Sequence, residues 1–163
     1  MNGTGAEAAA ALAALAAERH FTVAAAESCT GGLIGASITA RPGASEFFLG
    51  SAVTYANSAK EDLLGVPLGI LIQYGAVSAQ TARLMAAGAR RLYRADYALA
   101  VTGIAGPGGA TPGKPVGLVF IACAGPAGAA VRACHFTGDR AAVREQTVAT
   151  ALTFLTSFIR SSA

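Results

Sequence analysis

The stretch Ala24–Ile34 (AAAESCTGGLI) decides how the rest of the sequence is interpreted. The mostly apolar run 21–26 predicts a buried strand, and a helical pattern resumes after the glycine pair. Hydroxyl side chains at a strand end, followed by a Gly-Gly helix start, suit a nucleophile or a bound anion. The glycines admit another molecule, and the new helix points unpaired N–H groups at it. The same pattern fits a tight strand-to-helix turn with Thr30 or Ser28 as N-cap. Both interpretations stay open at this point.

The 163 residues fit one domain, residues 1–163, with enough chain for a sizeable core. Hydrophobic residues make up 53 % of the chain and charged residues 13 %, so we expect a homo-oligomer in which a partner covers part of the surface. The abundance of alanine and glycine suggests close packing of helices on a sheet. The net charge of +3 comes without a basic run, which argues against a nucleic-acid partner.

Two further features bear on location and metal content. The uncharged stretch 63–82 is interrupted by glycines and a proline, so we expect no membrane span. The three cysteines, Cys29, Cys123 and Cys134, form an odd set without metal-ligand spacing. This favours free thiols in a reducing compartment, hence a cytoplasmic protein, and we expect neither a metal nor another cofactor.

Helical and strand patterns alternate along the first part of the chain. Helices are predicted near 5–19, 31–39, 57–64, 78–93 and from 140 to the C-terminus, and 68–77 is a loop or a short helical segment. Asn57, Ser78 and Asp139 are the expected N-caps. Strands are predicted near 21–26, 47–55, 97–101, 118–124 and 130–136, the last two forming a hairpin. The order predicts an α/β fold, a single layered α/β/α domain with a mixed β-sheet covered by helices on both faces.

Lys60 is the first candidate for chemistry besides Ser28. It is expected at the third position of a helix capped by Asn57, where a capping box would place Glu or Gln. The positive end of the helix dipole and, to a greater extent, burial would lower the pKa of a lysine there. A lysine base needs such a shift, because a free lysine is almost fully protonated at neutral pH. The competing interpretation is a solvated surface lysine.

Two basic or glycine-rich stretches are candidates for binding. Residues 102–109 (TGIAGPGG) follow a predicted strand, so their backbone amides can surround a phosphate, although a mobile surface loop fits equally well. Arg140 and Arg144 open the last helix, either as a phosphate clamp or as a solvated face. Neither His20 nor His135 pairs obviously with Ser28 or Cys29, so a Ser–Lys scheme is favoured over a Ser-His-Asp triad.

Taken together, these motifs resemble the CinA C-terminal domain family, the nicotinamide mononucleotide deamidases. The matching stretches are AAESCTGGLI, FFLGSAVTYANSAKEDLLGV, YGAVSAQTA, VTGIAGPGGATPGKPVG and FTGDRAAVR, spread from about residue 5 to the C-terminus. No motif position departs from the family pattern. Longer family members carry an additional N-terminal domain, so the resemblance implies a stand-alone form.

The resemblance implies hydrolysis of the carboxamide of nicotinamide mononucleotide, with a pyridine nucleotide as the small-molecule partner. Family members use a serine nucleophile with a lysine and a tyrosine, which fall here on Ser28, Lys60 and Tyr55. Amides of Gly31 or Gly32 are expected to stabilise the oxyanion, and the ribose phosphate is expected to lie against the loop 102–106 and Arg140. The full set of expected substrate-binding residues is Thr30, Gly31, Gly32, Thr102, Gly103, Ala105, Gly106 and Arg140.

Two rival interpretations stay open. Cys29 rather than Ser28 could be the nucleophile, as in other amidases. The chain could also be a catalytically idle nucleotide-binding module that acts in competence or a DNA-damage response, as the family's historical name suggests.

Overall fold

The computed structural model describes residues 4–162 of the chain. Helices and strands occupy most of it, and their order is α1 (Gly5–Arg19), β1 (Val23–Glu27), α2 (Leu33–Thr39), η1 (Ala44–Glu46), β2 (Phe48–Val53), α3 (Asn57–Leu64), α4 (Leu68–Tyr74), α5 (Ala79–Tyr93), β3 (Tyr97–Gly103), β4 (Leu118–Gly125), β5 (Gly128–His135) and α6 (Arg140–Ser161).

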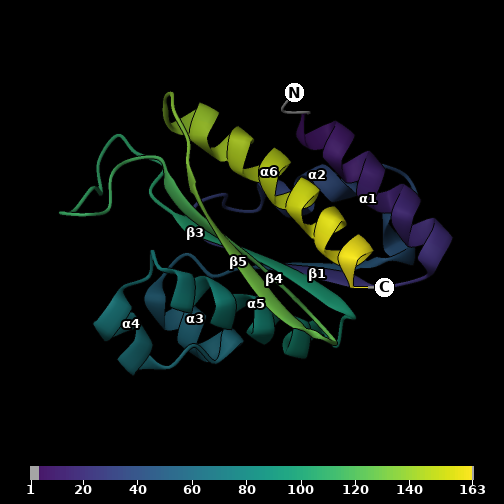
Figure 1. Ribbon diagram of the computed structural model, residues 1–163, viewed down its shortest axis with the longest axis horizontal. Coiled ribbons are helices and arrows are strands. Elements are labelled where there is room, and N and C mark those ends of the chain that lie inside the picture. Colours follow the sequence, from purple (N-terminus) through teal and green to yellow (C-terminus); the bar gives the residue numbers. More distant parts are fainter. Residues whose placement is uncertain (1–3, 163) are drawn as a thin grey trace.

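The five strands form one mixed sheet in the order β2-β1-β3-β4-β5. Strand β1 pairs in parallel with both β2 and β3, whereas β4 runs antiparallel to β3 and to β5. The carboxyl ends of β1, β2 and β3 therefore meet at one edge of the sheet. Figure 1 shows α1, α2 and α6 on one face and α3, α4 and α5 on the other, which confirms the predicted layered α/β architecture.

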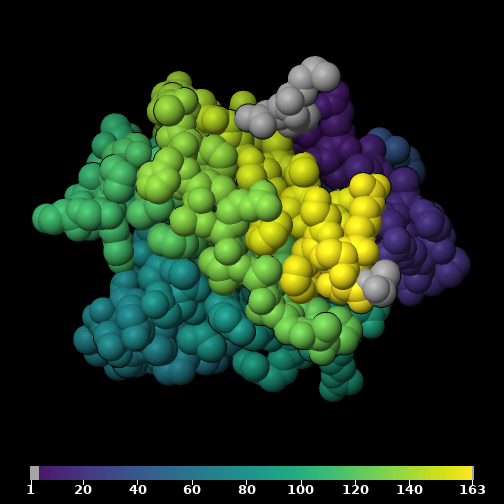
Figure 2. Space-filling view, in the orientation of Figure 1, coloured from purple at the N-terminus to yellow at the C-terminus, as the bar shows by residue number. Residues whose placement is uncertain are grey.

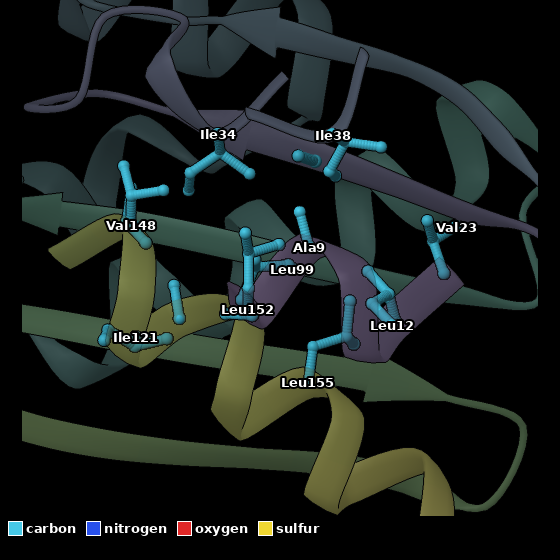
Figure 3. Packing of buried hydrophobic residues seen from close by; sticks show 14 of the residues in the cluster. Ala9, Leu12, Val23, Ile34, Ile38, Leu99, Ile121, Val148, Leu152 and Leu155 are labelled. Atoms are coloured by element: carbon cyan, nitrogen blue, oxygen red, sulfur yellow. The ribbon is translucent and has the colours of Figure 1, made fainter. Parts of the chain in front are cut away.

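The two faces of the sheet are packed with side chains of different size. In β3, Leu99 and Val101 point toward α1 and α6, where they join a cluster of branched side chains around Leu12 and Leu152 (Figure 3). The alternate residues, Ala98 and Ala100, face α5. This follows from strand geometry, because successive side chains of a β-strand point to opposite faces of the sheet. Alanine on the α5 face lets that helix approach the sheet closely, as the composition predicts.

Two of the three predicted helix N-caps are found in the structure. Ser78 and Asp139 accept hydrogen bonds from the N–H groups three residues on, so both predictions are confirmed. The prediction for Asn57 is wrong. Ala56 is the N-cap of α3 and Asn57 is its first helical residue, because the N–H of Lys60 already bonds to the carbonyl of Ala56.

Helix α2 also begins later than expected. It starts at Leu33 rather than at residue 31, and its N-cap is Gly32 in the left-handed region, with no capping side chain. Neither Thr30 nor Ser28 caps it, so that part of the turn interpretation is wrong. Segment 68–74 is the short helix α4. None of the helices within residues 4–162 is long and apolar enough to cross a membrane.

The long loop between β3 and β4 projects from the molecule beside α3 and α4 (Figures 1 and 2). The side-chain amine of Lys114 donates to the carbonyl of Tyr74 at 2.6 Å and so ties this loop to the end of α4. The loop begins at the end of β3, where the second glycine-rich stretch lies.

Candidate active site

A pocket of about 280 Å³ lies at the edge where the parallel strands end. Segments that follow β1, β2 and β3 line it, together with α3 and the start of α6. Its lining residues are Ser28, Cys29, Tyr55, Asn57, Lys60, Ala76, Val77, 102–106, Gly108, Gly109 and Arg140. Two larger hollows, of about 410 and 780 Å³, lie elsewhere and contain neither Ser28 nor Lys60.

Lys60 lies beneath this pocket and is 1 % exposed. Its Nζ is 3.1 Å from Ser28 Oγ, 2.8 Å from the carbonyl oxygen of Thr54 and 3.1 Å from that of Tyr55. Burial lowers the pKa of Lys60, because it disfavours the charged ammonium. Lys60 is therefore not the solvated surface lysine of the competing interpretation.

The three partners of Lys60 determine how its neutral form binds. Carbonyl oxygens only accept hydrogen bonds, so those of Thr54 and Tyr55 take the two N–H groups of a neutral amine. The remaining lone pair then faces Ser28, whose hydroxyl can donate to it. This arrangement is that of a general base in contact with a nucleophile.

Cys29, next to Ser28, has a different environment. Its side chain is buried, and burial raises the pKa of the thiol to about 11. A thiol with that pKa is protonated at neutral pH, and the reactive species would be the thiolate. The geometry thus favours Ser28 over Cys29 as the nucleophile.

Tyr55 contributes to the site in two separate ways. Its carbonyl oxygen holds Lys60, whereas its hydroxyl lies 3.2 Å from Arg140 Nη2. Arg140 also donates from Nη1 to the carbonyl of Gly106 at 2.8 Å and so connects the segment after β2 with the glycine-rich loop. The Tyr55 side chain is 60 % exposed at the mouth of the pocket.

The glycine-rich loop supplies backbone donors. Ala105 and Gly106 line the pocket, and within residues 4–162 their N–H groups have no hydrogen-bond partner. The hydroxyl of Thr102, by contrast, donates to the carbonyl of Ala76 at 2.8 Å and is committed to holding the loop. Gly103 lines the pocket as the last residue of β3.

The structure does not bring Thr30, Gly31 and Gly32 to this pocket. The N–H of Gly32 donates to Glu27, the N–H of Gly31 donates to the carbonyl of Ser28, and the Thr30 hydroxyl donates to Glu27. These groups are occupied within the loop, so they are not free donors for an oxyanion or a phosphate. The anion expected at the Gly-Gly helix start is the chain's own Glu27 carboxylate.

Glu27 and Arg144 are the site-forming residues whose roles the sequence did not predict. Glu27 is completely buried, and Arg144 donates to the carbonyls of Cys29 and Thr30 at 3.2 and 3.0 Å. An acidic residue that closes an otherwise apolar strand was the available signal for Glu27. Arg144 is more than 100 residues away in the chain, and nothing local predicted its partners.

Comparison with known proteins agrees with this architecture. The family model of the CinA C-terminal domain matches residues 5–159. The chain belongs to the CinA C-terminal domain family. A CinA-like protein of Geobacter metallireducens is 57 % identical over 144 residues, and one of Geobacter sulfurreducens is 54 % identical over 145 residues. These matches cover 88 % and 89 % of this chain but 35 % of each relative, so the chain spans about a third of their length.

Solved structures of the family have the same fold. The competence/damage inducible protein CihA of Agrobacterium tumefaciens is 42 % identical with a TM-score of 0.92, and the match covers 95 % of both chains. A CinA superfamily protein of Klebsiella pneumoniae is 31 % identical with a TM-score of 0.94, covering 98 % of this chain and 99 % of that one.

Proposed function

We propose that this protein hydrolyses the carboxamide of nicotinamide mononucleotide to nicotinic acid mononucleotide and ammonia. The observation that carries the proposal is the contact of 3.1 Å between the buried Lys60 amine and the Ser28 hydroxyl. Such a pair activates a serine for attack on an amide carbonyl without a histidine. Membership of the CinA C-terminal domain family supports the same reaction through the family resemblance described above.

The first half of the reaction acylates Ser28. Neutral Lys60 takes the proton of the Ser28 hydroxyl as the oxygen attacks the carboxamide carbon. The resulting ammonium lies beside the tetrahedral oxyanion and stabilises it electrostatically in a pocket from which substrate excludes water. Collapse breaks the C–N bond, and the leaving nitrogen receives the proton from Lys60, directly or through Tyr55, and departs as ammonia.

The second half releases the acid. A water molecule attacks the acyl ester while Lys60 takes one of its protons, and collapse returns that proton to Ser28. The nucleotide phosphate binds the free N–H groups of Ala105 and Gly106 and the guanidinium of Arg140, all at the pocket. The Gly31 and Gly32 amides, expected beside the attacked carbonyl, are occupied within the loop, and the Lys60 ammonium takes their place in the proposed mechanism.

Ammonia release tests the proposal. Wild-type protein should release ammonia from nicotinamide mononucleotide and yield the acid in equal amount, whereas Ser28→Ala should release none. Ser45→Ala is the matched control, because Ser45 is exposed and lies outside the pocket. Nicotinamide riboside, which lacks the phosphate, should react more slowly. A wild-type protein that binds the mononucleotide and releases no ammonia would instead be the idle nucleotide-binding module.

A further inference from the structure

The buried carboxylate of Glu27 takes no part in the reaction described above, yet it adjoins the nucleophile in the chain. We infer that Glu27 is a positioning residue for Ser28: its carboxylate holds the loop 28–32 in the conformation that places the Ser28 hydroxyl against Lys60. The part of this inference that concerns turnover rests on the proposed function, and the part that concerns Ser28 reactivity does not.

The carboxylate collects five hydrogen bonds without any exposure to solvent. Oε2 accepts from Thr30 Oγ1 at 2.7 Å, from Gly32 N at 3.1 Å and from Ile34 N at 3.0 Å. Oε1 accepts from Gly35 N at 2.9 Å and from Ser51 Oγ at 2.7 Å. Hydrogen bonds to an ionised acceptor are about twice as strong as neutral ones. One side chain thus joins the loop, the start of α2 and strand β2.

Three sets of hydrogen bonds fix the position of Ser28 and of the loop that follows it. Glu27 accepts from the Thr30 hydroxyl and the Gly32 N–H, and the guanidinium of Arg144 donates to the carbonyls of Cys29 and Thr30. The N–H of Ser28 itself bonds to the carbonyl of Val101 in β3 at 3.1 Å. Lys60 is fixed independently by the carbonyls after β2, so the Ser28–Lys60 distance depends on how firmly the loop is held.

The chemistry of the five partners requires a carboxylate at this position. All five groups donate to Glu27, and an ionised carboxylate has only acceptor sites. In Glu27→Gln, a side chain of the same shape, the amide NH₂ would face donors in either orientation: the N–H groups of Gly32 and Ile34 if it replaces Oε2, or the N–H of Gly35 if it replaces Oε1. The loop would then shift to separate them, and Ser28 would move with it.

Ser28 reactivity tests this without assuming a substrate. A fluorophosphonate probe labels an activated serine, so wild-type protein should be labelled at Ser28 and Ser28→Ala should not. In Glu27→Gln the labelling rate should fall about 100-fold, as expected for an ångström-scale misplacement of a reacting group. With nicotinamide mononucleotide, kcat should fall by a similar factor and KM should change little, because the proposed phosphate donors lie on the loop after β3 and at the start of α6.

Thr147→Val is the control for general loss of a buried hydrogen bond. Thr147 is equally buried and its hydroxyl donates to the carbonyl of Val143 within α6, not to the loop 28–32. It should lower the melting temperature and leave the labelling rate of the folded protein unchanged. If Glu27→Gln does not fold, Ser51→Ala removes one of the five bonds and should slow labelling by a smaller factor.

Chemical rescue separates an anion requirement from mere packing. Glu27→Ala leaves space at the start of α2 for a small carboxylate, so formate should raise its labelling rate above that in chloride at equal ionic strength. Labelling of Glu27→Gln at the wild-type rate, or no rescue by formate, would overturn the inference. Wild-type protein that is labelled at Ser28 but releases no ammonia would refute the proposed function alone.

Discussion

The Nζ of Lys60 lies 3.1 Å from the Oγ of Ser28, although 32 positions separate the two residues in the sequence. The contact forms because Ser28 follows β1 and Lys60 belongs to the helix after β2, the parallel neighbour of β1. Two carbonyl oxygens occupy the other donor positions of the amine. Burial lowers the pKa of this amine, and the proposed role of Lys60 as a general base requires its neutral form.

Lys60→Arg should abolish turnover as completely as Lys60→Ala. Arginine keeps the positive charge but does not give up a proton at any working pH, so it cannot act as a base. Loss of a general base typically costs about 10²–10⁴-fold in rate. Steady-state ammonia release measures this, with binding of nicotinamide mononucleotide as the check that the pocket survives. Turnover near the wild-type rate would show that Lys60 supplies only charge.

The acidic limb of the rate profile should report the ionisation of Lys60. Only the neutral amine accepts the Ser28 proton, so kcat/KM should fall as the pH drops through the lowered pKa of Lys60. Its midpoint should lie well below the value of about 10.4 for a free lysine. His135→Gln is the control, since His135 does not line the pocket. A limb that moves with this histidine would contradict the assignment.

Cys29→Ala should retain a substantial fraction of the wild-type turnover. Burial raises the pKa of the Cys29 thiol to about 11, so almost no thiolate exists at neutral pH. Its backbone carbonyl, which holds Arg144, is unaffected by the substitution. Ammonia release by this variant beside Ser28→Ala separates the two candidate nucleophiles. An inactive Cys29→Ala with an active Ser28→Ala would reverse the mechanism.

The order of helices and strands and the layered α/β architecture could be predicted, because the periodicity of apolar side chains and the turn residues that bound each element are local features of the sequence. The Ser–Lys scheme was favoured because neither histidine pairs obviously with Ser28, whereas the parallel pairing of β1 with β2, which brings Lys60 to Ser28, is seen only in the structure. The cap of α3 was wrong because cap preference ranks Asn57 above Ala56, whereas the backbone bond from Lys60 N–H to the Ala56 carbonyl sets the helix start.

Other parts of the site depend on contacts that no local pattern carries. The partners of Glu27 include three backbone N–H groups, which nearly every residue possesses, so their convergence leaves no mark in the sequence. The contact between Arg140 and the Tyr55 hydroxyl joins residues 85 positions apart. The N–H of Gly32 donates to the Glu27 carboxylate and that of Gly31 to the Ser28 carbonyl, so neither amide is free to bind substrate.

Gly88→Ala should destabilise the protein, whereas Gly69→Ala should not. A Cβ on Gly88 in α5 would overlap the carbonyl oxygen of Leu64 at the end of α3, the helix that carries Lys60. Overpacking of this kind costs about 1–3 kcal/mol. At Gly69 in α4 a Cβ meets nothing within 4 Å, and alanine is the better helix former.

Thermal unfolding of the two glycine variants makes the comparison. Each kcal/mol shifts the melting temperature by about 2–4 °C in a protein of this size. Gly88→Ala should therefore melt several degrees below wild type, and Gly69→Ala at or slightly above it. Equal melting temperatures would show that α5 can move away from α3 at little cost.

Replacing Lys60 by methionine should show that burying this lysine costs stability, and that the cost depends on pH. The folded state lowers the pKa of Lys60, so it binds fewer protons than the unfolded chain between the lowered pKa and about 10.4. The wild-type free energy of unfolding should therefore gain a contribution that rises with pH across this window. Methionine has similar length and does not titrate, so the variant lacks that contribution.

The free energy of unfolding of Lys60→Met minus that of wild type should consequently be largest below the folded pKa of Lys60 and decrease as the pH rises. Each unit by which the pKa is lowered corresponds to about 1.4 kcal/mol of this difference. Urea unfolding of both proteins from pH 6 to pH 10 measures it, with the linear slope against urea as the check that both unfold alike. A difference independent of pH would mean that Lys60 stays protonated in the folded protein, and the neutral-base mechanism would then be untenable.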